Sequence, residues 1–342
     1  MLTVKILFAI IIKKARLDRD FRKGDNMKTI TKLLLGTAGA AAAAYGTWTL
    51  IDELLFNKKM ILPPEVGAKF SGCDMSHLRE LLTNNLKWVE DYGYEKHYIM
   101  SDRGEGLVGY LMKAKEPSNV YVFGAHGYRS YGKKEFCGFA QYYLSRGVNV
   151  FFPDHIASGE SDGTHCTFGY YEKEDCMKWL KYMTDHFGED IKIILHGVSM
   201  GSATVCMMSG RDDLPENVKY TVADCGFTTA KALFKFKMDA LGIPDVGLLR
   251  GVNLANKLNH GFDFRDIAPV ESVAKAKVPM FFVHGKEDNL VPAFMAEELY
   301  DSCSSEYKDI LVVEGADHAQ AHVAGKEAYE EKMDEFMEKF VK

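Results

Sequence analysis

From about residue 95 onward, short apolar runs alternate with longer stretches of helical periodicity. Most runs are rich in Val, Ile and Phe and apolar throughout, which is typical of strands covered on both faces of a sheet. They occupy 97–102, 107–114, 119–127, 148–155, 191–197, 218–226, 278–285 and 309–318. Helical patterns at 136–145, 172–186 and 200–209 separate them, and an amphipathic pattern at 325–342 closes the chain. This alternation predicts an α/β fold with a mostly parallel, doubly wound sheet.

Two connections depart from this alternation of strands and helices. Residues 103–106 (Arg-Gly-Glu-Gly) join the first two runs and predict a hairpin. The connection 227–277 has 51 residues, which is long for a loop without secondary structure, and 229–241 and 246–258 have helical patterns. We therefore expect a small helical cap inserted at 227–277.

The N-terminal region has another pattern. Residues 33–51 contain no charge, and as a helix they would be ~28 Å long, close to the ~30 Å hydrocarbon thickness of a bilayer. Residues 1–32 contain nine Lys or Arg and three Asp. Because basic flanks stay on the cytoplasmic side, we expect a basic leader (1–32), a transmembrane anchor (33–51) and a domain (61–342) outside the cytoplasm. A cleaved signal peptide, a buried Ala-rich helix and a disordered segment are alternatives, and Met27 could be the natural start.

Composition narrows the function classes. The 342 residues are 47% hydrophobic and 26% charged, an ordinary globular balance. The net charge is −6, and without the +6 leader it is −12, so nothing points to nucleic-acid binding. The seven cysteines form no CxxC pair or zinc-type cluster, so we expect buried thiols, although a disulfide stays open. The oligomeric state does not follow from the sequence.

The strongest chemical signal is Gly197-Val198-Ser199-Met200-Gly201, between an apolar strand and a helical pattern. A sharp turn from strand to helix strains the serine backbone, and the flanking glycines leave room for it. The turn exposes the serine oxygen beside the N-terminal amides of the helix. We expect Ser199 to be a nucleophile.

A serine hydroxyl needs a histidine base, which an acid orients. Reacting groups in such sheets gather at the carboxyl ends of strands. His318 follows the last strand, and Asp288 follows the strand before it. The chain order Ser199, Asp288, His318 is that of α/β-hydrolases. Asp224, at the end of 218–226, is a rival acid, and Asp317 is too close to His318 in sequence to face its ring easily.

The oxyanion of acyl transfer needs two backbone N–H donors. Met200 follows the nucleophile and should supply one. The second should come from Tyr128, in the loop His126-Gly127-Tyr128-Arg129 after an early strand. We expect His126 to be structural and Arg129 to fix this loop, with binding of a substrate carboxylate as the alternative role for Arg129.

Other polar and aromatic residues are less strongly indicated as active-site residues. Ser158 and Ser161 lie in a Gly/Ser/Asp-rich loop without the strand-to-helix context and are expected to be loop hydrogen-bonding residues. A last group is expected to pack rather than to form the site: Met207, Met208, Phe234 and Phe236.

With HGYR at 126–129, GVSMG at 197–201, HGKEDNLVP at 284–292 and GADH at 315–318, the chain resembles the α/β-hydrolase superfamily from about residue 95 onward. Within it, the sequence is similar to bacterial serine aminopeptidase-like and prolyl-oligopeptidase-like hydrolases, including membrane-anchored ones. It has no HGGG motif, so the hormone-sensitive-lipase-like branch fits poorly. We expect no propeller domain before the hydrolase domain, which argues against an oligopeptidase in the strict sense.

The resemblance implies acyl transfer to water through Ser199, with no metal or organic cofactor. We expect a carboxylic-ester hydrolase for small or lipid-like acyl substrates. A peptidase or amidase of the same fold is the alternative, and a non-catalytic binding protein is a third possibility. A free amino terminus would need acids to bind it, and no motif marks such acids.

Overall fold

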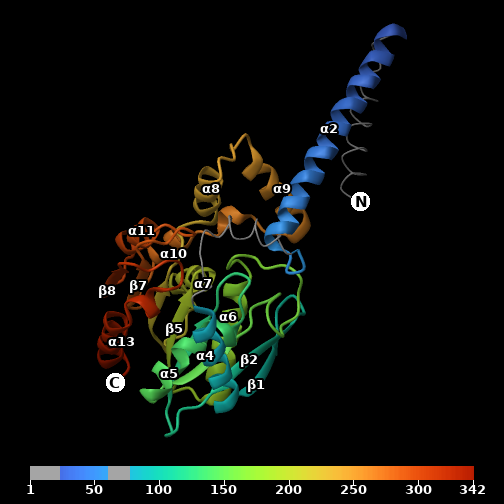
Figure 1. Ribbon diagram of the computed structural model, residues 1–342. Coiled ribbons are helices and arrows are strands. Elements are labelled where there is room, and N and C mark those ends of the chain that lie inside the picture. Colours follow the sequence, from blue (N-terminus) through green and yellow to red (C-terminus); the bar gives the residue numbers. More distant parts are fainter. Residues whose placement is uncertain (1–23, 61–77) are drawn as a thin grey trace.

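An eight-stranded sheet forms the centre of the molecule in the computed structural model (Figure 1). The structure describes the backbone of residues 24–60 and 78–342, and the side chains from residue 39 onward within those ranges. The strands are β1 (Glu95–Met100), β2 (Gly106–Met112), β3 (Val120–Ala125), β4 (Asn149–Pro153), β5 (Lys192–Val198), β6 (Val218–Asp224), β7 (Met280–Gly285) and β8 (Lys308–Val313).

The sheet order is β1-β2-β4-β3-β5-β6-β7-β8. β1 pairs antiparallel with β2 and β2 with β4, whereas every pair from β4 to β8 is parallel. The predicted hairpin and the mostly parallel sheet are confirmed. The strands from β3 to β8 therefore end at a common edge, which gathers the loops that follow them.

Helices cover both faces of this sheet. The helices of the described chain are α2 (Gly24–Phe56), α4 (Arg79–Tyr92), α5 (Gly132–Ser145), α6 (Glu172–Phe187), α7 (Met200–Ser209), α8 (Ala230–Ala240), α9 (Leu248–His260), α10 (Pro269–Val273), α11 (Phe294–Ser302), α12 (Ala321–Ala324) and α13 (Lys326–Phe340), with a 3-10 turn, η2 (Phe264–Asp266). Residues of α4, α5 and α13 pack on one face of the sheet, and those of α6, α7, α10 and α11 on the other.

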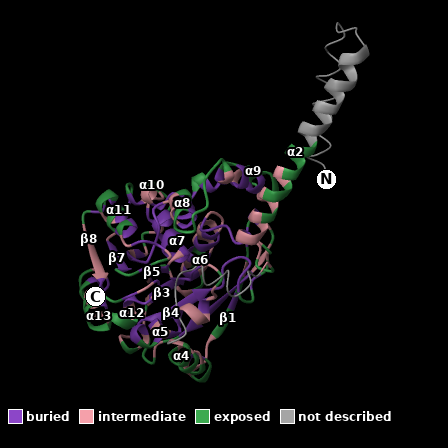
Figure 2. Cartoon of the chain, turned by 45° about the horizontal axis from the view of Figure 1, so that its top comes forward, coloured by how far each residue is buried: buried purple, intermediate pink, exposed green. Residues whose placement is uncertain are grey.

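Alternation along each strand produces these two layers. In β3, Val122 points into the layer of α5 and α13, while Tyr121 and Phe123 point into the layer of α6. The central strands β3, β4, β5 and β7 are consequently buried almost throughout, as the burial colours of Figure 2 show for the centre of the molecule, whereas β1 at the sheet edge is largely exposed. This double coverage explains why the sequence shows continuous apolar runs instead of an alternating pattern.

The long connection contains the two predicted helices. They are α8 and α9, whose bounds differ from the predicted 229–241 and 246–258 by at most two residues. They lie above the carboxyl edge of the sheet in Figure 1. The segment also contains η2 and α10, which the pattern did not predict because they are only three and five residues long.

The N-terminal region differs from its prediction. Residues 33–51 are helical, as part of α2, but no helix in the described part of the chain is long and apolar enough to cross a membrane. The stretch is built mainly from Ala, Gly and Thr, which are less apolar than Leu or Ile. Tyr45 and Trp48, within this stretch, contact α9: the Tyr45 hydroxyl donates to Asn259 at 2.9 Å, and the Trp48 ring occupies the space beside Gly251. The predicted anchor is thus not supported, and most of the leader (1–23) lies outside the described residues.

The prediction of buried thiols is confirmed for the described residues. Six cysteines lie in the described ranges, and all six are free and buried. Cys73 lies outside these ranges.

Candidate active site

Ser199 occupies the turn between β5 and α7 with a left-handed backbone, φ 57° and ψ −114°. L-residues rarely adopt such angles, so the turn stores strain at the serine. A Cβ on Gly201 would collide with the carbonyl of Ala125, and one on Gly197 with the carbonyl of Gly201. The two glycines are therefore a steric requirement of the turn that lifts Ser199 above the sheet.

His318 lies in the loop between β8 and α12, and its two ring nitrogens face two different partners. Nε2 lies 2.8 Å from Oγ of Ser199, and Nδ1 lies 2.7 Å from Oδ2 of Asp288. Asp288 comes from the loop after β7 and also accepts hydrogen bonds from the backbone N–H of Leu290 and Val291 at 2.9 and 2.8 Å. The structure thus joins the three residues predicted from the sequence into one hydrogen-bonded chain.

The electrostatics of this chain favour a basic imidazole. Burial by itself lowers the pKa of His318, but the hydrogen bond and negative charge of Asp288 outweigh burial, and the pKa is raised above its ordinary 6.5. Burial by itself raises the pKa of Asp288, yet hydrogen bonds from His284 and His318 hold this pKa well below its usual range. Asp288 therefore stays a carboxylate that stabilises a protonated His318.

Asp224, the rival acid, has a different partner. It is buried at the end of β6, and its Oδ2 accepts a hydrogen bond from the hydroxyl of Tyr329 at 2.9 Å. Burial raises the pKa of Asp224 to about 6, although the hydrogen bond from Tyr329 opposes that rise. The geometry therefore gives Asp288, and not Asp224, the contact with the His318 ring.

Asp317 is likewise turned away from the imidazole. Its Oδ1 accepts from the backbone N–H of His318 and of Asn289, at 2.8 and 3.2 Å. It thereby fastens the His318 loop to the Asp288 loop, which sequence reasoning did not anticipate.

The loop after β3 lies directly beside the nucleophile. A Cβ on Gly127 would be 3.4 Å from Cβ of Ser199, an ordinary van der Waals contact, so this loop passes close to the serine. Tyr128 and Met200 both line the same pocket as Ser199. Met200 begins α7, where the first N–H groups have no intrahelical acceptor. Both residues stand where oxyanion donors are expected, and that role remains a prediction.

The neighbouring residues of this loop have structural contacts. His126 is fully buried; its Nδ1 lies 2.8 Å from the Gly127 carbonyl, and its Nε2 accepts from the N–H of His155 at 2.9 Å. The Arg129 guanidinium donates to the carbonyls of Leu54 and Met60, each at 2.8 Å, and so ties the loop to the end of α2. The structural interpretation of both residues is confirmed.

Ser161 also behaves as predicted, because its hydroxyl donates to the Asp154 carbonyl and accepts from the N–H of Val108. Met207 and Met208 are buried in hydrophobic clusters, and Phe236 packs against one of them. Ser158 is buried in its loop, with its N–H bonded to the His155 carbonyl.

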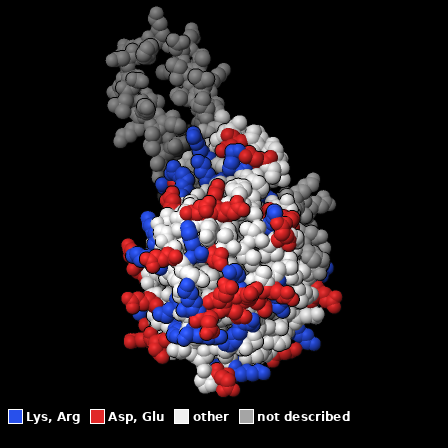
Figure 3. Space-filling model, turned by 90° about the vertical axis from the view of Figure 1, so that its left-hand side faces the viewer, with Lys and Arg blue, Asp and Glu red and all other residues white. Residues whose placement is uncertain are grey.

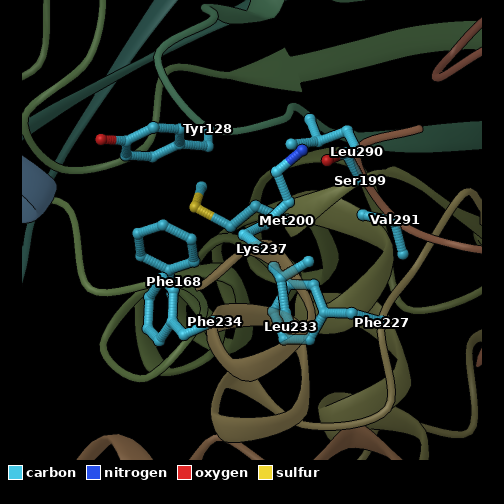
Figure 4. A pocket seen from close by; sticks show the side chains of 10 residues that line it. All are labelled: Tyr128, Phe168, Ser199, Met200, Phe227, Leu233, Phe234, Lys237, Leu290 and Val291. Atoms are coloured by element: carbon cyan, nitrogen blue, oxygen red, sulfur yellow. The ribbon is translucent and has the colours of Figure 1, made fainter. Parts of the chain in front are cut away.

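An apolar pocket opens at Ser199, with a cavity of about 40 Å³ (Figure 4). Aromatic rings form one side, with Phe168 and Phe234 next to Tyr128, and Leu290 and Val291 lie opposite. Its lining consists of Tyr128, Phe168, Ser199, Met200, Phe227, Leu233, Phe234, Lys237, Leu290 and Val291. Phe234 was expected only to pack; it packs in a hydrophobic cluster and also lines the pocket.

Several of these residues had no signal in the sequence. Leu233 and Phe234 are adjacent on α8 and Lys237 lies about one turn later, so the three share the face toward the pocket, but this spacing is that of any amphipathic helix. His284, which does not line the pocket, supports the acid: its Nε2 lies 3.1 Å from Oδ2 of Asp288 and 2.8 Å from the Val291 carbonyl. His284 precedes Asp288 by four residues, and such local spacing has no chemical signature.

A parallel α/β sheet that carries a strained serine after β5, an acid after β7 and a histidine after β8 defines an α/β-hydrolase. Residues 136–342, more than half of the chain, match the model of the prolyl oligopeptidase family, and the chain belongs to that family. This membership agrees with the resemblance seen in the sequence, and it makes the protein a serine hydrolase.

Individual relatives agree with this placement. YqkD of Bacillus subtilis, an uncharacterized protein, is 27% identical over 244 residues, covering 70% of this chain and 78% of its own. Among solved structures, an esterase of Pyrococcus furiosus superimposes with a TM-score of 0.60 at 20% identity, over 74% of this chain and 93% of its own. Est1E from Butyrivibrio proteoclasticus, solved with ferulic acid, superimposes with a TM-score of 0.56 at 20% identity, over 71% of this chain and 100% of its own. At these identities the structures support the shared fold.

Proposed function

We propose that this protein hydrolyses carboxylic esters with small apolar acyl groups through an acyl-enzyme on Ser199. The observation that carries the proposal is the hydrogen-bonded chain Ser199–His318–Asp288 at the mouth of an apolar pocket. A pocket lined by aromatic and aliphatic side chains favours an apolar acyl group, and its small cavity favours a short one.

In the first half of the reaction, Oγ of Ser199 attacks the ester carbonyl carbon while Nε2 of His318 takes the hydroxyl proton. The tetrahedral oxyanion is stabilised by the backbone N–H groups of Tyr128 and Met200. When the bond between the carbonyl carbon and the alcohol oxygen breaks, His318 returns the proton to the leaving alcohol.

In the second half, His318 activates a water molecule that attacks the acyl-enzyme. The bond to Oγ of Ser199 breaks, the carboxylic acid leaves, and the serine regains its proton. Asp288 keeps its charge throughout and orients the imidazole, whose Nδ1 it faces at 2.7 Å.

The peptidase alternative is favoured by the name of the family. Recognition of a free amino terminus requires a negatively charged side chain near the scissile bond. The residues that line the described pocket include one cation, Lys237, and no Asp or Glu. The lining therefore favours an ester with an apolar acyl group over a peptide with a charged amino terminus.

The test compares p-nitrophenyl esters of increasing chain length with aminoacyl-arylamides. We expect acetyl and butyryl esters to be cleaved faster than long-chain esters and arylamides. Faster cleavage of arylamides would transfer the assignment to the peptidase alternative.

The nucleophile is tested separately with a fluorophosphonate probe. Ser199→Ala should lose labelling and at least about 1,000-fold in activity, because no other group can form the acyl-enzyme. Ser158→Ala, in a neighbouring loop, is the matched control and should still be labelled. Labelling that persists in Ser199→Ala would disprove the assignment.

The cellular location is a further proposal: the N-terminal segment associates the enzyme with a membrane and leaves the catalytic domain outside the cytoplasm. Its support is the sequence alone, in which a basic stretch precedes the uncharged residues 33–51. Fractionation of cells, followed by protease treatment of intact cells, tests it. Recovery in the soluble cytoplasmic fraction would overturn it.

A further inference from the structure

A second group of titratable side chains lies at the junction of α2, the loop before α6 and the end of α9. Asp52 and Glu53 come from α2, His165 from the loop, and His260 from the last residue of α9. Backbone hydrogen bonds fix this junction: the Lys58 N–H donates to the Thr164 carbonyl and that of Cys166 to the Phe56 carbonyl, both at 2.8 Å. None of these four side chains belongs to the active site described above.

Three of the side chains converge on one point. One ligand atom each from Glu53, His165 and His260 lies within 4.8 Å of the other two. Nε2 of His165 is 3.2 Å from Oε2 of Glu53, and the centroids of the two imidazole rings are 4.1 Å apart. Donors around a tetrahedral Zn²⁺ lie about 3.4 Å apart, given bond lengths near 2.1 Å. Modest side-chain rotations would therefore bring the three donors into coordination distance.

The donor set suits a particular class of ion. Two imidazole nitrogens and one carboxylate oxygen are a common set for zinc and other divalent transition metals, whereas Mg²⁺ and Ca²⁺ prefer oxygen alone. Nδ1 of His165 lies 2.7 Å from the Thr164 hydroxyl, which fixes the ring and leaves Nε2 facing Glu53. Such support of the outer ring nitrogen is typical of metal-bound histidines.

Asp52 provides an independent indication. Its side chain is fully buried, its Oδ2 lies 2.8 Å from Nε2 of His260, and its Oδ1 has no hydrogen-bond partner in the described chain. A buried carboxylate with an unpaired oxygen is costly unless a positive charge is near. Together with Glu53 it places two negative charges at the junction, which balance a divalent cation.

We propose that Glu53, His165 and His260 bind a divalent transition-metal ion, with Asp52 as a positioning residue behind His260. The side chains of Glu53, His165 and His260 are 31%, 22% and 11% exposed, so an ion can enter from solvent. The site would cross-link α2, the loop before α6 and the end of α9. It lies near the oxyanion loop, because Tyr128 and Arg129 donate to the carbonyls of Leu55 and Leu54 at the end of α2.

The experiment uses the full chain, without a histidine tag and freed of metal by a chelator. Zn²⁺ is titrated by calorimetry and thermal unfolding, and Co²⁺ by absorption spectroscopy. We expect one ion per chain, a rise in Tm, and the visible d–d bands of tetrahedral Co²⁺. These readouts are independent of esterase activity, so they can fail while the proposed function stands.

Substitutions locate the binding. His165→Ala and His260→Ala should abolish one-to-one binding, and Asp52→Asn should weaken it about 10- to 100-fold. Glu53→Gln keeps the shape of the side chain and should also abolish binding, so the test survives if a histidine variant unfolds. His186→Ala is the matched control, because His186 belongs to another histidine pair, with its ring centroid 5.6 Å from that of His97.

Unchanged binding in Glu53→Gln and the two histidine variants would place the metal elsewhere and overturn the proposal. Absence of binding in the metal-free wild-type chain would also overturn it, and would leave the junction as a pair of His–carboxylate contacts.

Discussion

Two buried carboxyl groups, Asp288 and Asp224, lie at neighbouring strand ends near His318, and hydrogen-bond geometry separates their roles. Asp288 faces Nδ1 of His318 and keeps its charge, because His284 and His318 donate to it. Asp224 is bonded to Tyr329 and its pKa is raised to about 6 by burial.

We therefore expect Asp288→Asn to lose activity far more than Asp224→Asn. An amide at 288 can no longer stabilise the protonated imidazole or fix its tautomer, which in serine hydrolases costs roughly 10⁴-fold in kcat. Asp224→Asn should stay within about tenfold of the parent, because the residue contacts Tyr329. Steady-state kinetics with a short-chain ester measure both losses. A larger loss in Asp224→Asn than in Asp288→Asn would make Asp224 the acid that orients His318.

The pH dependence follows from the raised pKa of His318. The imidazole must be neutral to take the Ser199 proton, so activity falls as the pH drops through its pKa. Because this pKa lies above 6.5, the acid limb of kcat/KM should have its midpoint above pH 6.5. In Asp288→Asn the charge that raises the pKa is gone, so the residual activity should show a limb at lower pH. An unmoved limb would mean that another group titrates there.

At the scale of elements, α8 borders the apolar pocket at Ser199. Leu233 and Phe234 form part of its wall, and both are buried in the hydrophobic cluster that includes Phe56 and Phe262. We therefore expect acyl-length selectivity to depend on a helix outside the sheet, whereas Ser199, Asp288 and His318 lie on loops at the sheet edge.

Leu233→Ala should shift the preference toward longer acyl chains, because it enlarges the cavity beside Ser199. We expect kcat/KM for octanoyl over butyryl p-nitrophenyl esters to rise about tenfold, a size set by the burial of a few methylene groups. Lys231→Ala, on the exposed face of the same helix, should leave the ratio unchanged. A ratio that stays constant in Leu233→Ala would place the acyl group elsewhere.

At the scale of the whole molecule, α2 links the N-terminal region to the cap helices and the catalytic domain. It leaves the body as a long projecting helix in Figure 1, yet its last turns pack on α9 and its end contacts Tyr128 and Arg129 of the loop after β3. On the face shown in Figure 3, acidic and basic side chains are interspersed without a continuous basic patch.

Packing between α2 and α9 should contribute to the stability of the enzyme. Trp48→Ala removes the ring that fills the space beside Gly251, and should lower the free energy of unfolding by about 1–3 kcal/mol. Leu50 lies on the same helix and is 53% exposed, so Leu50→Ala should change the free energy of unfolding by less than about 0.5 kcal/mol. Denaturant unfolding measures both, and equal effects would argue against this packing.

The hydrogen-bonded chain of Ser199, His318 and Asp288 was largely predictable, because these residues lie in local contexts with a physical signature. Ser199 is marked by the two glycines that its turn requires, and His318 and Asp288 follow apolar strands that run to one sheet edge. The pocket was not predictable to the same degree. Phe168, Phe234 and Leu290 come from three separate segments, and each has the ordinary pattern of a packed side chain.

The N-terminal helix shows the opposite case. Its uncharged stretch predicted a membrane anchor, but hydropathy along a chain does not reveal which residues of a helix contact another helix. The contacts of Tyr45, Trp48 and Asp52 with α9 exist only in three dimensions.

The sequence by itself determined the α/β sheet, the serine turn and the order of Ser199, Asp288 and His318 along the chain, because each follows from local residue types or from the periodicity of one element. The tertiary structure alone decided which acid faces His318, which side chains wall the pocket, and that Glu53, His165 and His260 meet. These depend on groups far apart in the chain, whose approach is set by packing and leaves no spacing to be recognised.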